Sequence, residues 1–107
     1  MSLQLSSDAL TKMIHQKERV DLACAFRWTA RMGMHEAVAN HFSLAVGDGT
    51  SFLINPNQKH FSLIKASDIL LLKTDEDPFK LQNAPDPTAW GLHNSLHKFV
   101  PHAKCVI

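Results

Sequence analysis

The first half of the chain carries apolar residues at helical spacing. No proline occurs between residues 5 and 34, and side chains suited to a buried face recur three, four, seven and eight residues apart, which predicts a helix. The recurring positions are Leu22, Ala25, Phe26, Thr29 and Ala30. A polar patch at 16–19 divides this region into two helices or lies within one long one, and residues 1–15 are expected to be an N-terminal helical extension. Gly33 is the predicted helix end.

The period then changes from helical to alternating. Phe42, Leu44 and Val46 share one face of a predicted strand over residues 41–46, and a second apolar run follows at 51–54. The segment Gly47-Asp48-Gly49 between them predicts a β-hairpin. Further strands are predicted at residues 69–72, 79–81 and 103–107. A second helix is predicted at about 88–99, ended by Pro101.

This order of elements predicts an α/β fold with α-β-α layers. The central sheet is predominantly antiparallel and is flanked by helices. The chain has 107 residues, which suits one domain. Its last residues, Ala103 to Ile107, form an open apolar run without a turn or polar tail. An unfinished strand would expose unpaired backbone groups, so residues 1–107 are predicted to be a single truncated domain.

Charge and composition exclude several classes of protein. The net charge is +1 and Lys and Arg form no basic stripe, so a nucleic-acid or membrane-surface partner is not expected. No apolar run approaches the length of about 18 residues that a membrane span needs, and no secretory signal is present. Cys24 and Cys105 lie among apolar neighbours without metal-type spacing, which predicts reduced, buried thiols in a cytoplasmic protein.

Seven histidines invite a search for a metal site. His35 and His41 are six residues apart, which excludes the zincin motif because a helical metal pair needs a separation of four. His93 and His97 have that separation on the second predicted helix, and could form one edge of a zinc site. No third ligand is spaced to join them, so packing at the helix–sheet boundary or exposure to solvent is the favoured alternative.

Three loops carry polar residues that could bind a small ligand. Asn40-His41-Phe42-Ser43 precedes the first strand and could hold an anion or form a plain turn. Asn55-Pro56-Asn57-Gln58 leaves the second strand, where a functional loop and a simple turn are both common. Asp86-Pro87-Thr88-Ala89 opens the second helix, where backbone N–H groups favour an anion, although Thr88 could equally be an N-cap.

Taken in order, these segments resemble the N-terminal part of the class II aldolase and adducin-head family. The resemblance covers about residues 16–107. The segments that carry it are Asn40-His41-Phe42-Ser43, Ile54-Asn55-Pro56, Ala66-Ser67-Asp68-Ile69-Leu70, Asp86-Pro87-Thr88-Ala89, Leu92-His93 and His102-Ala103-Lys104-Cys105-Val106-Ile107.

The resemblance implies the chemistry and the partners of the full-length protein. Enzymes of the family use a divalent metal, usually zinc, to cleave small sugar phosphates by retro-aldol chemistry, and family members form tetramers. A His-x-His pair follows the strand that matches Cys105-Val106-Ile107, so the metal ligands are expected after Ile107 and none within this chain. His41, Asn57 and Thr88 are the residues that the resemblance assigns to substrate or anion binding, in one cleft at one edge of the sheet.

The sequence departs from the aldolase pattern at the residue that would transfer a proton. Where the enzymes carry Ser-Ser-Glu before the helix, this chain has Pro87-Thr88-Ala89, and alanine cannot act as an acid or base. No catalytic residue is therefore predicted within these 107 residues, and the fragment is expected to be inactive. Two functions remain open, a metal-dependent aldehyde-lyase of small sugar-like substrates and an adducin-like module that binds partners without catalysis. The lyase is the favoured interpretation.

Overall fold

The computed structural model describes residues 14–36 and 38–107, so most of the predicted N-terminal extension lies outside the described residues. Two α-helices, four strands and two short 3-10 helices follow one another along this part of the chain. They are α2 (Gln16–Arg31), β1 (Ser43–Val46), β2 (Ser51–Ile54), η1 (Phe61–Leu63), η2 (Ala66–Asp68), β3 (Leu70–Lys73), α3 (Pro87–Phe99) and β4 (Cys105–Val106). These elements match most of the predicted ones within one or two residues.

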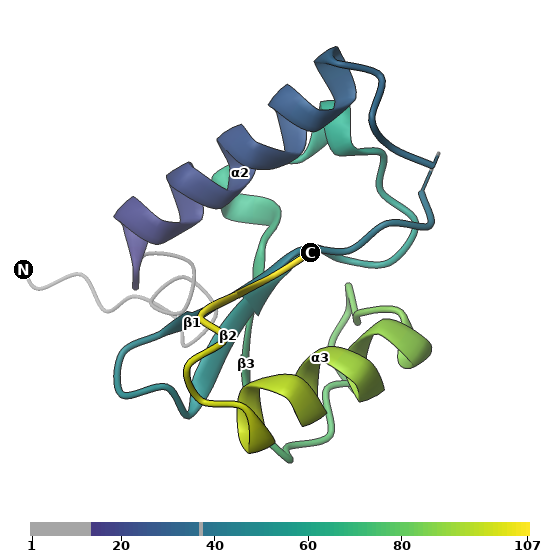
Figure 1. Ribbon diagram of the computed structural model, residues 1–107. Coiled ribbons are helices and arrows are strands. Elements are labelled where there is room, and N and C mark those ends of the chain that lie inside the picture. Colours follow the sequence, from purple (N-terminus) through teal and green to yellow (C-terminus); the bar gives the residue numbers. More distant parts are fainter. Residues whose placement is uncertain (1–13, 37) are drawn as a thin grey trace, which may run out of the picture.

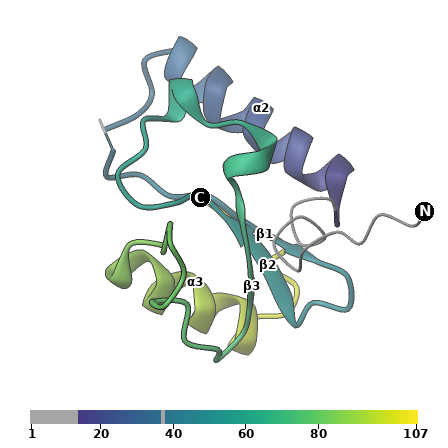
Figure 2. The same cartoon turned by 180° about the vertical axis from the view of Figure 1, so that it is seen from behind.

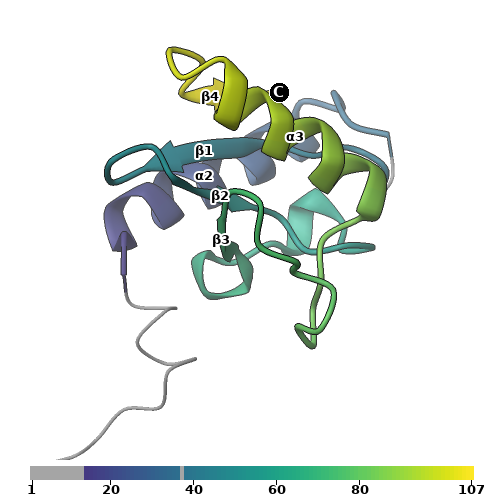
Figure 3. The ribbon, with the colours of Figure 1, turned by 90° about the horizontal axis from the view of Figure 1, so that it is seen from below.

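The strands form one sheet in the order β3-β2-β1-β4, and every neighbouring pair is antiparallel. Helix α2 lies on one face of the sheet and α3 on the other (Figure 1), and the view from behind shows the same three layers. Seen from below, α3 runs across the sheet and β4 lies beside β1 (Figure 3). The predicted fold class, with α-β-α layers around an antiparallel sheet, is therefore confirmed.

Helix α2 begins at Gln16, so the polar patch at 16–19 forms its start, and the helix ends where Gly33 was expected to stop it. Gly33 has a φ of 70°, its N–H bonds to the Ala30 carbonyl, and the Met34 N–H bonds to the Thr29 carbonyl. This pair of bonds is the Schellman motif, which favours glycine because its φ is positive. No helix among the described residues is long and apolar enough to cross a membrane.

The sheet has a different core on each face because side chains alternate along every strand. Toward α2, Leu53 packs with a buried cluster that includes Phe26, Phe42 and Phe61. Toward α3, Phe52 and Ile54 pack with Leu72, and with the partly buried Leu70 and Trp90. The predicted common face of Phe42, Leu44 and Val46 is confirmed, since all three belong to the cluster under α2.

The strand predicted at residues 79–81 is wrong. These residues form turns, because the Asp77 side chain accepts a hydrogen bond from the Phe79 N–H and the Pro78 carbonyl accepts one from Leu81. An Asx turn bends the backbone away from the extended form that a strand needs. The Phe79 ring packs instead against Trp90 of α3, with ring centroids 5.5 Å apart.

The predicted burial of both cysteines is also wrong, since Cys24 and Cys105 are free and exposed. Apolar neighbours in sequence do not share a face of a helix, and Cys24 lies on the outer side of α2, away from Ala23 and Phe26. Cys105 lies on β4, at the edge of the sheet formed by the described residues.

Candidate functional site

One buried side chain joins the loop before β1 to the loop after β2. Asn55 accepts a hydrogen bond from the Phe42 N–H at 3.3 Å and donates one to the Asn40 carbonyl at 3.1 Å. Its exposed fraction is 1%. Because a buried amide must find partners for both of its ends, Asn55 holds the two loops side by side.

The loop after β2 also meets the segment that leads into α3. The Asn57 N–H donates to the Ala84 carbonyl at 3.1 Å, and Pro85 beside it is fully buried. Asn55 thus joins the loop before β1 to the loop after β2. Asn57 joins the loop after β2 to the segment that precedes α3. Segments far apart in the sequence meet at this end of the molecule.

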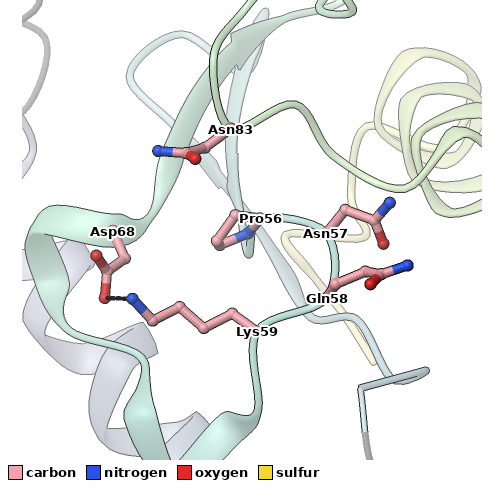
Figure 4. Close-up of a pocket in the computed structure, with 6 residues that line it drawn as sticks. All are labelled: Pro56, Asn57, Gln58, Lys59, Asp68 and Asn83. Atoms are coloured by element: carbon pink, nitrogen blue, oxygen red, sulfur yellow. Dashed lines mark ion pairs between the residues drawn. The ribbon is translucent and has the colours of Figure 1, made fainter.

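A polar cavity of about 240 Å³ opens at this junction and is lined mostly by the loop after β2. Figure 4 shows that the lining side chains come from that loop, from η2 and from the segment before α3. They are Pro56, Asn57, Gln58, Lys59, Asp68 and Asn83. Three amides offer both donors and acceptors, which suits hydroxyl groups of a small polar ligand. Of the three predicted site residues, Asn57 alone lines this cavity.

The charges in the cavity compensate each other. Lys59 Nζ lies 3.1 Å from Asp68 Oδ2, and Asp68 also accepts a hydrogen bond from the Lys65 N–H at 2.8 Å. Burial by itself would raise the pKa of Asp68, but the Lys65 N–H and the Lys59 ammonium outweigh it and lower that pKa. The carboxylate stays ionised at neutral pH, so this cavity presents an ion pair and amides rather than a free cation.

His41 lies close to the start of α3. Burial lowers its pKa, and the nearby Asp86 carboxylate opposes that effect in part. Its Nε2 atom is buried and finds no hydrogen-bond partner among residues 14–36 and 38–107. Buried ring nitrogens usually find a partner, so His41 is a polar group that the described residues leave unsatisfied. Binding of an anion or substrate by His41 stays a prediction.

Thr88 lies in the first turn of α3, where it is exposed. The alternative that Thr88 is the N-cap is wrong, because Asp86 holds that position and its Oδ2 accepts a hydrogen bond from the Ala89 N–H at 2.9 Å. Pro87 follows as the first helical residue, where a missing N–H costs nothing. The Thr88 hydroxyl is therefore not needed for the cap, and its role in binding stays a prediction.

His93 and His97 meet on one serine of β1. Ser43 Oγ lies 2.5 Å from His93 Nδ1 and 2.7 Å from His97 Nε2. All three side chains are buried, with exposed fractions of 0% for Ser43 and 4% for each histidine. The His97 ring also stacks on Phe52 at 4.9 Å. The prediction that the histidines pack at the helix–sheet boundary is confirmed.

Burial and like charges keep this cluster neutral. Burial lowers the pKa of His93 to about 4, with further lowering by the nearby rings of His41 and His97. Burial also lowers the pKa of His97, although the Ala103 carbonyl acts in the opposite direction. Both imidazoles are therefore uncharged at neutral pH, and each ring carries one proton, on one of its two nitrogens.

Ser43 and Asn55 were not singled out from the sequence as site residues. Ser43 lies in the predicted loop before the first strand and Asn55 in the loop after the second. Their partners lie 50 and 15 residues away in sequence, so no local pattern could identify them. The available signal was their position, since a polar residue on the inward face of a predicted strand needs a partner there.

A divalent metal does not fit the described residues as they stand. Among residues 14–36 and 38–107, no three His, Cys, Asp or Glu side chains are close enough together to hold a metal ion. The facing nitrogens of His93 and His97 are both occupied by Ser43. Helical spacing therefore does not make these histidines a metal pair here.

Comparison with known sequences places most of the chain in one family. Residues 20–107 match the class II aldolase and adducin N-terminal domain. A protein of Pseudomonas aeruginosa classed by name with the class 2 aldolases is 31% identical over 99% of this chain and 41% of its own length. The meiotically up-regulated gene 14 protein of Schizosaccharomyces pombe is 32% identical over 79% of this chain and 34% of its own length.

Solved structures share the fold. An aldolase II superfamily protein from Pseudomonas syringae superposes with a TM-score of 0.72 at 25% identity, over 95% of this chain and 39% of its own. The L-fuculose 1-phosphate aldolase from Glaciozyma antarctica PI12 gives 0.67 at 18% identity, over 98% and 43%. The chain thus spans about two fifths of the length of these structures. On the match over residues 20–107, the chain belongs to the class II aldolase and adducin N-terminal domain family.

Proposed function

We propose that the full-length protein is a metal-dependent aldehyde-lyase that acts on a small sugar or a sugar-phosphate-like substrate. The observation that carries this proposal is the amide-lined cavity at Asn57, in the loop after β2, which hydrogen bonds join to the loop before β1 and to the segment before α3. Sites where several polar groups converge from separate loops are the usual place for a small-molecule substrate. Membership of the family supports the lyase class.

His41, Asn57 and Thr88 are the residues proposed to contact the substrate. Asn57 offers an amide in the cavity, His41 an unpartnered buried nitrogen, and Thr88 an exposed hydroxyl in the first turn of α3. The first turn of a helix favours an anionic group because its backbone N–H groups point outward. The metal, zinc by analogy with the family, would be held by residues that follow Ile107.

The full-length protein is also proposed to be cytoplasmic and to assemble with copies of itself. Large apolar side chains near the end of α2 support the assembly, because exposed apolar surface commonly marks an interface. Trp28, Met32 and Met34 each expose 60% or more of their surface. Sedimentation of the full-length protein at several concentrations measures the oligomer directly.

The experiment is a metal and activity assay on the full-length protein. We expect about one divalent ion per chain by elemental analysis, and release of aldehyde from a ketose 1-phosphate such as fuculose 1-phosphate. Asn57→Ala should raise KM about tenfold, as expected for a lost hydrogen bond to a bound hydroxyl. Gln82→Ala, an exposed amide one residue outside the cavity lining, is the matched control and should change KM less than twofold.

The second candidate is an adducin-like module that binds partners without catalysis. Ala89 favours it, because alanine stands where the resemblance places the acid/base glutamate, and loss of such a group typically costs about 100- to 10,000-fold in rate. A full-length protein that binds no metal and cleaves no ketose phosphate would support this candidate. If Ala89→Glu instead raises turnover in the metal-loaded protein, the lyase assignment and the mapping of Ala89 both stand.

A further inference from the structure

Helix α3 carries an imidazole one turn after the alanine that interrupts the family pattern. Ala89, His93 and His97 are spaced by four residues and lie on the buried face of the helix, toward the sheet. Residues four apart on a helix lie one above the other on the same side. His93 therefore lies one turn after Ala89 on the buried face of α3, and it is the titratable side chain on this face next to the position of the missing carboxylate.

The Ser43 hydroxyl has one proton, so it donates to one of the two rings and accepts from the other. When His97 Nε2 accepts the Ser43 proton, Ser43 Oγ accepts from His93 Nδ1–H, and His93 Nε2 keeps its lone pair. In the opposite arrangement, Ser43 donates to His93 Nδ1, and His93 Nε2 carries the proton. The first arrangement is the one in which His93 can accept a proton at Nε2.

The groups around His93 come from three parts of the chain. His97 lies on the same helix, Ser43 on β1, and His41 on the loop before β1, where Asp86 is the nearby carboxylate. The His41 ring is close enough for its charge to disfavour protonation of His93. His41 thus brings the loop assigned to substrate binding next to the imidazole of α3.

We propose that His93 is the proton acceptor of this domain in place of the carboxylate missing at Ala89, with Ser43 and His97 as its positioning residues. The proposal rests on the proposed lyase function. In cleavage, His93 Nε2 takes the proton of the substrate hydroxyl, the O–H electron pair forms the new C=O bond, and the C–C bond breaks. The electron pair of the broken C–C bond moves onto the carbon next to the carbonyl that the substrate already had. The imidazolium then returns its proton to that carbon.

The protonation state of His93 agrees with this role. With a pKa of about 4, the ring is uncharged at neutral pH and so has a lone pair to offer. An anionic substrate bound beside it would raise that pKa, because a nearby negative charge favours the imidazolium. The proton affinity would then rise at the moment when a proton has to be accepted.

Long-range ¹H–¹⁵N NMR on the 107-residue chain measures the tautomer without metal or substrate. We expect a protonated Nδ1 and an unprotonated Nε2 on His93 at pH 7. Ser43→Ala removes the acceptor of Nδ1–H and should shift His93 toward the Nε2–H tautomer. A proton found on Nε2 of His93 in the unmodified chain overturns the proposal, because Nε2 would then have no lone pair to accept the substrate proton.

A second measurement tests whether His93 lies at the position of the missing carboxylate. Ala89→Glu should raise the proton affinity of His93 at least tenfold, because it places a carboxylate one turn away on the same face. Ser95→Glu puts the same charge on the exposed side of α3 and should change that affinity less than threefold. Equal effects of the two substitutions would contradict the proposal.

The outcomes separate this proposal from the proposed function. The tautomer and the proton affinity of His93 are read on a chain without substrate, so an adverse result there leaves the metal and lyase assays unaffected. Absence of lyase activity in the full-length protein would overturn the proposed function while the His93 tautomer stays as measured.

Discussion

At the scale of single residues, the most consequential feature is a polar cluster in an otherwise apolar layer. Ser43, His93 and His97 are buried between β1 and α3, where an unpaired polar group would cost about 1–3 kcal/mol. One hydroxyl satisfies a nitrogen of each ring, and burial keeps both rings neutral. Protonation of either imidazole would place an unpaired charge in this layer, so the cluster makes the fold sensitive to acid.

Acid should therefore destabilise the domain before its carboxylates titrate. The folded pKa of His93, about 4, is lower than its ordinary value of 6.5, so its contribution is complete above pH 6.5 and is lost as pH falls toward 4. His41 and His97 shift in the same direction. With allowance for solvent screening, we expect the free energy of unfolding to fall by about 2 kcal/mol between pH 7 and 4.5.

Urea unfolding at the two pH values measures this loss. His93→Gln, which keeps a hydrogen-bonding group beside Ser43 but does not titrate, should show a clearly smaller loss. The lowered pKa values of Asp68 and Asp75 lie below 3.8, so these carboxylates do not contribute in this window. A stability that is constant from pH 7 to 4.5 would show that His93 is not buried in its neutral form.

At the scale of elements, side chains in loops decide where helices and strands meet. Asp86 caps α3 and lies near His41, while Asn55 joins the loops that flank β1 and β2. Neither residue is part of the apolar pattern. Both act through backbone groups that regular hydrogen bonding leaves unpaired at the ends of elements. The start of α3 is therefore fixed by Asp86 and not by Thr88.

Substitutions at these two positions should separate capping from binding. Asp86→Ala removes the acceptor of the Ala89 N–H and should lower the free energy of unfolding by about 1 kcal/mol. Thr88→Val keeps the shape of an exposed side chain and should change it by less than about 0.5 kcal/mol. Thermal melting of the 107-residue chain measures both. A loss for Thr88→Val as large as that for Asp86→Ala would contradict the capping assignment.

At the scale of the whole molecule, the sheet separates two unlike cores. The face under α2 is aromatic, with Phe26 stacked on Phe42 at 5.0 Å and edge-on to Phe61 at 4.6 Å. The face under α3 combines Phe52 and Ile54 with the buried histidines. The first face holds the larger apolar cluster, while the buried histidines lie on the second face. This division leaves candidate chemistry on the α3 side.

Phe26→Ala should accordingly be among the most damaging single changes. The side chain is fully buried, and such a truncation costs about 3–5 kcal/mol, a large part of the total stability of a small domain. Trp28, two residues later, is 60% exposed, and the Arg31 guanidinium lies 5.5 Å from the centre of its ring, so Trp28→Ala should cost less than about 1 kcal/mol. Guanidinium unfolding of both variants gives the comparison, and similar losses would mean that α2 packs by another face.

The sequence by itself determined the features that depend on local geometry. The Gly-Asp-Gly hairpin, the helix end at Gly33 and the span of α3 follow from backbone preferences and from hydrophobic period, which act over a few residues. Only the tertiary structure decided that Ser43 joins His93 and His97, that residues 79–81 form turns while β4 lies beside β1, and that Cys24 faces solvent. These outcomes depend on which surfaces meet when a helix folds over a sheet, and a buried polar group takes its partner from whatever that packing brings near.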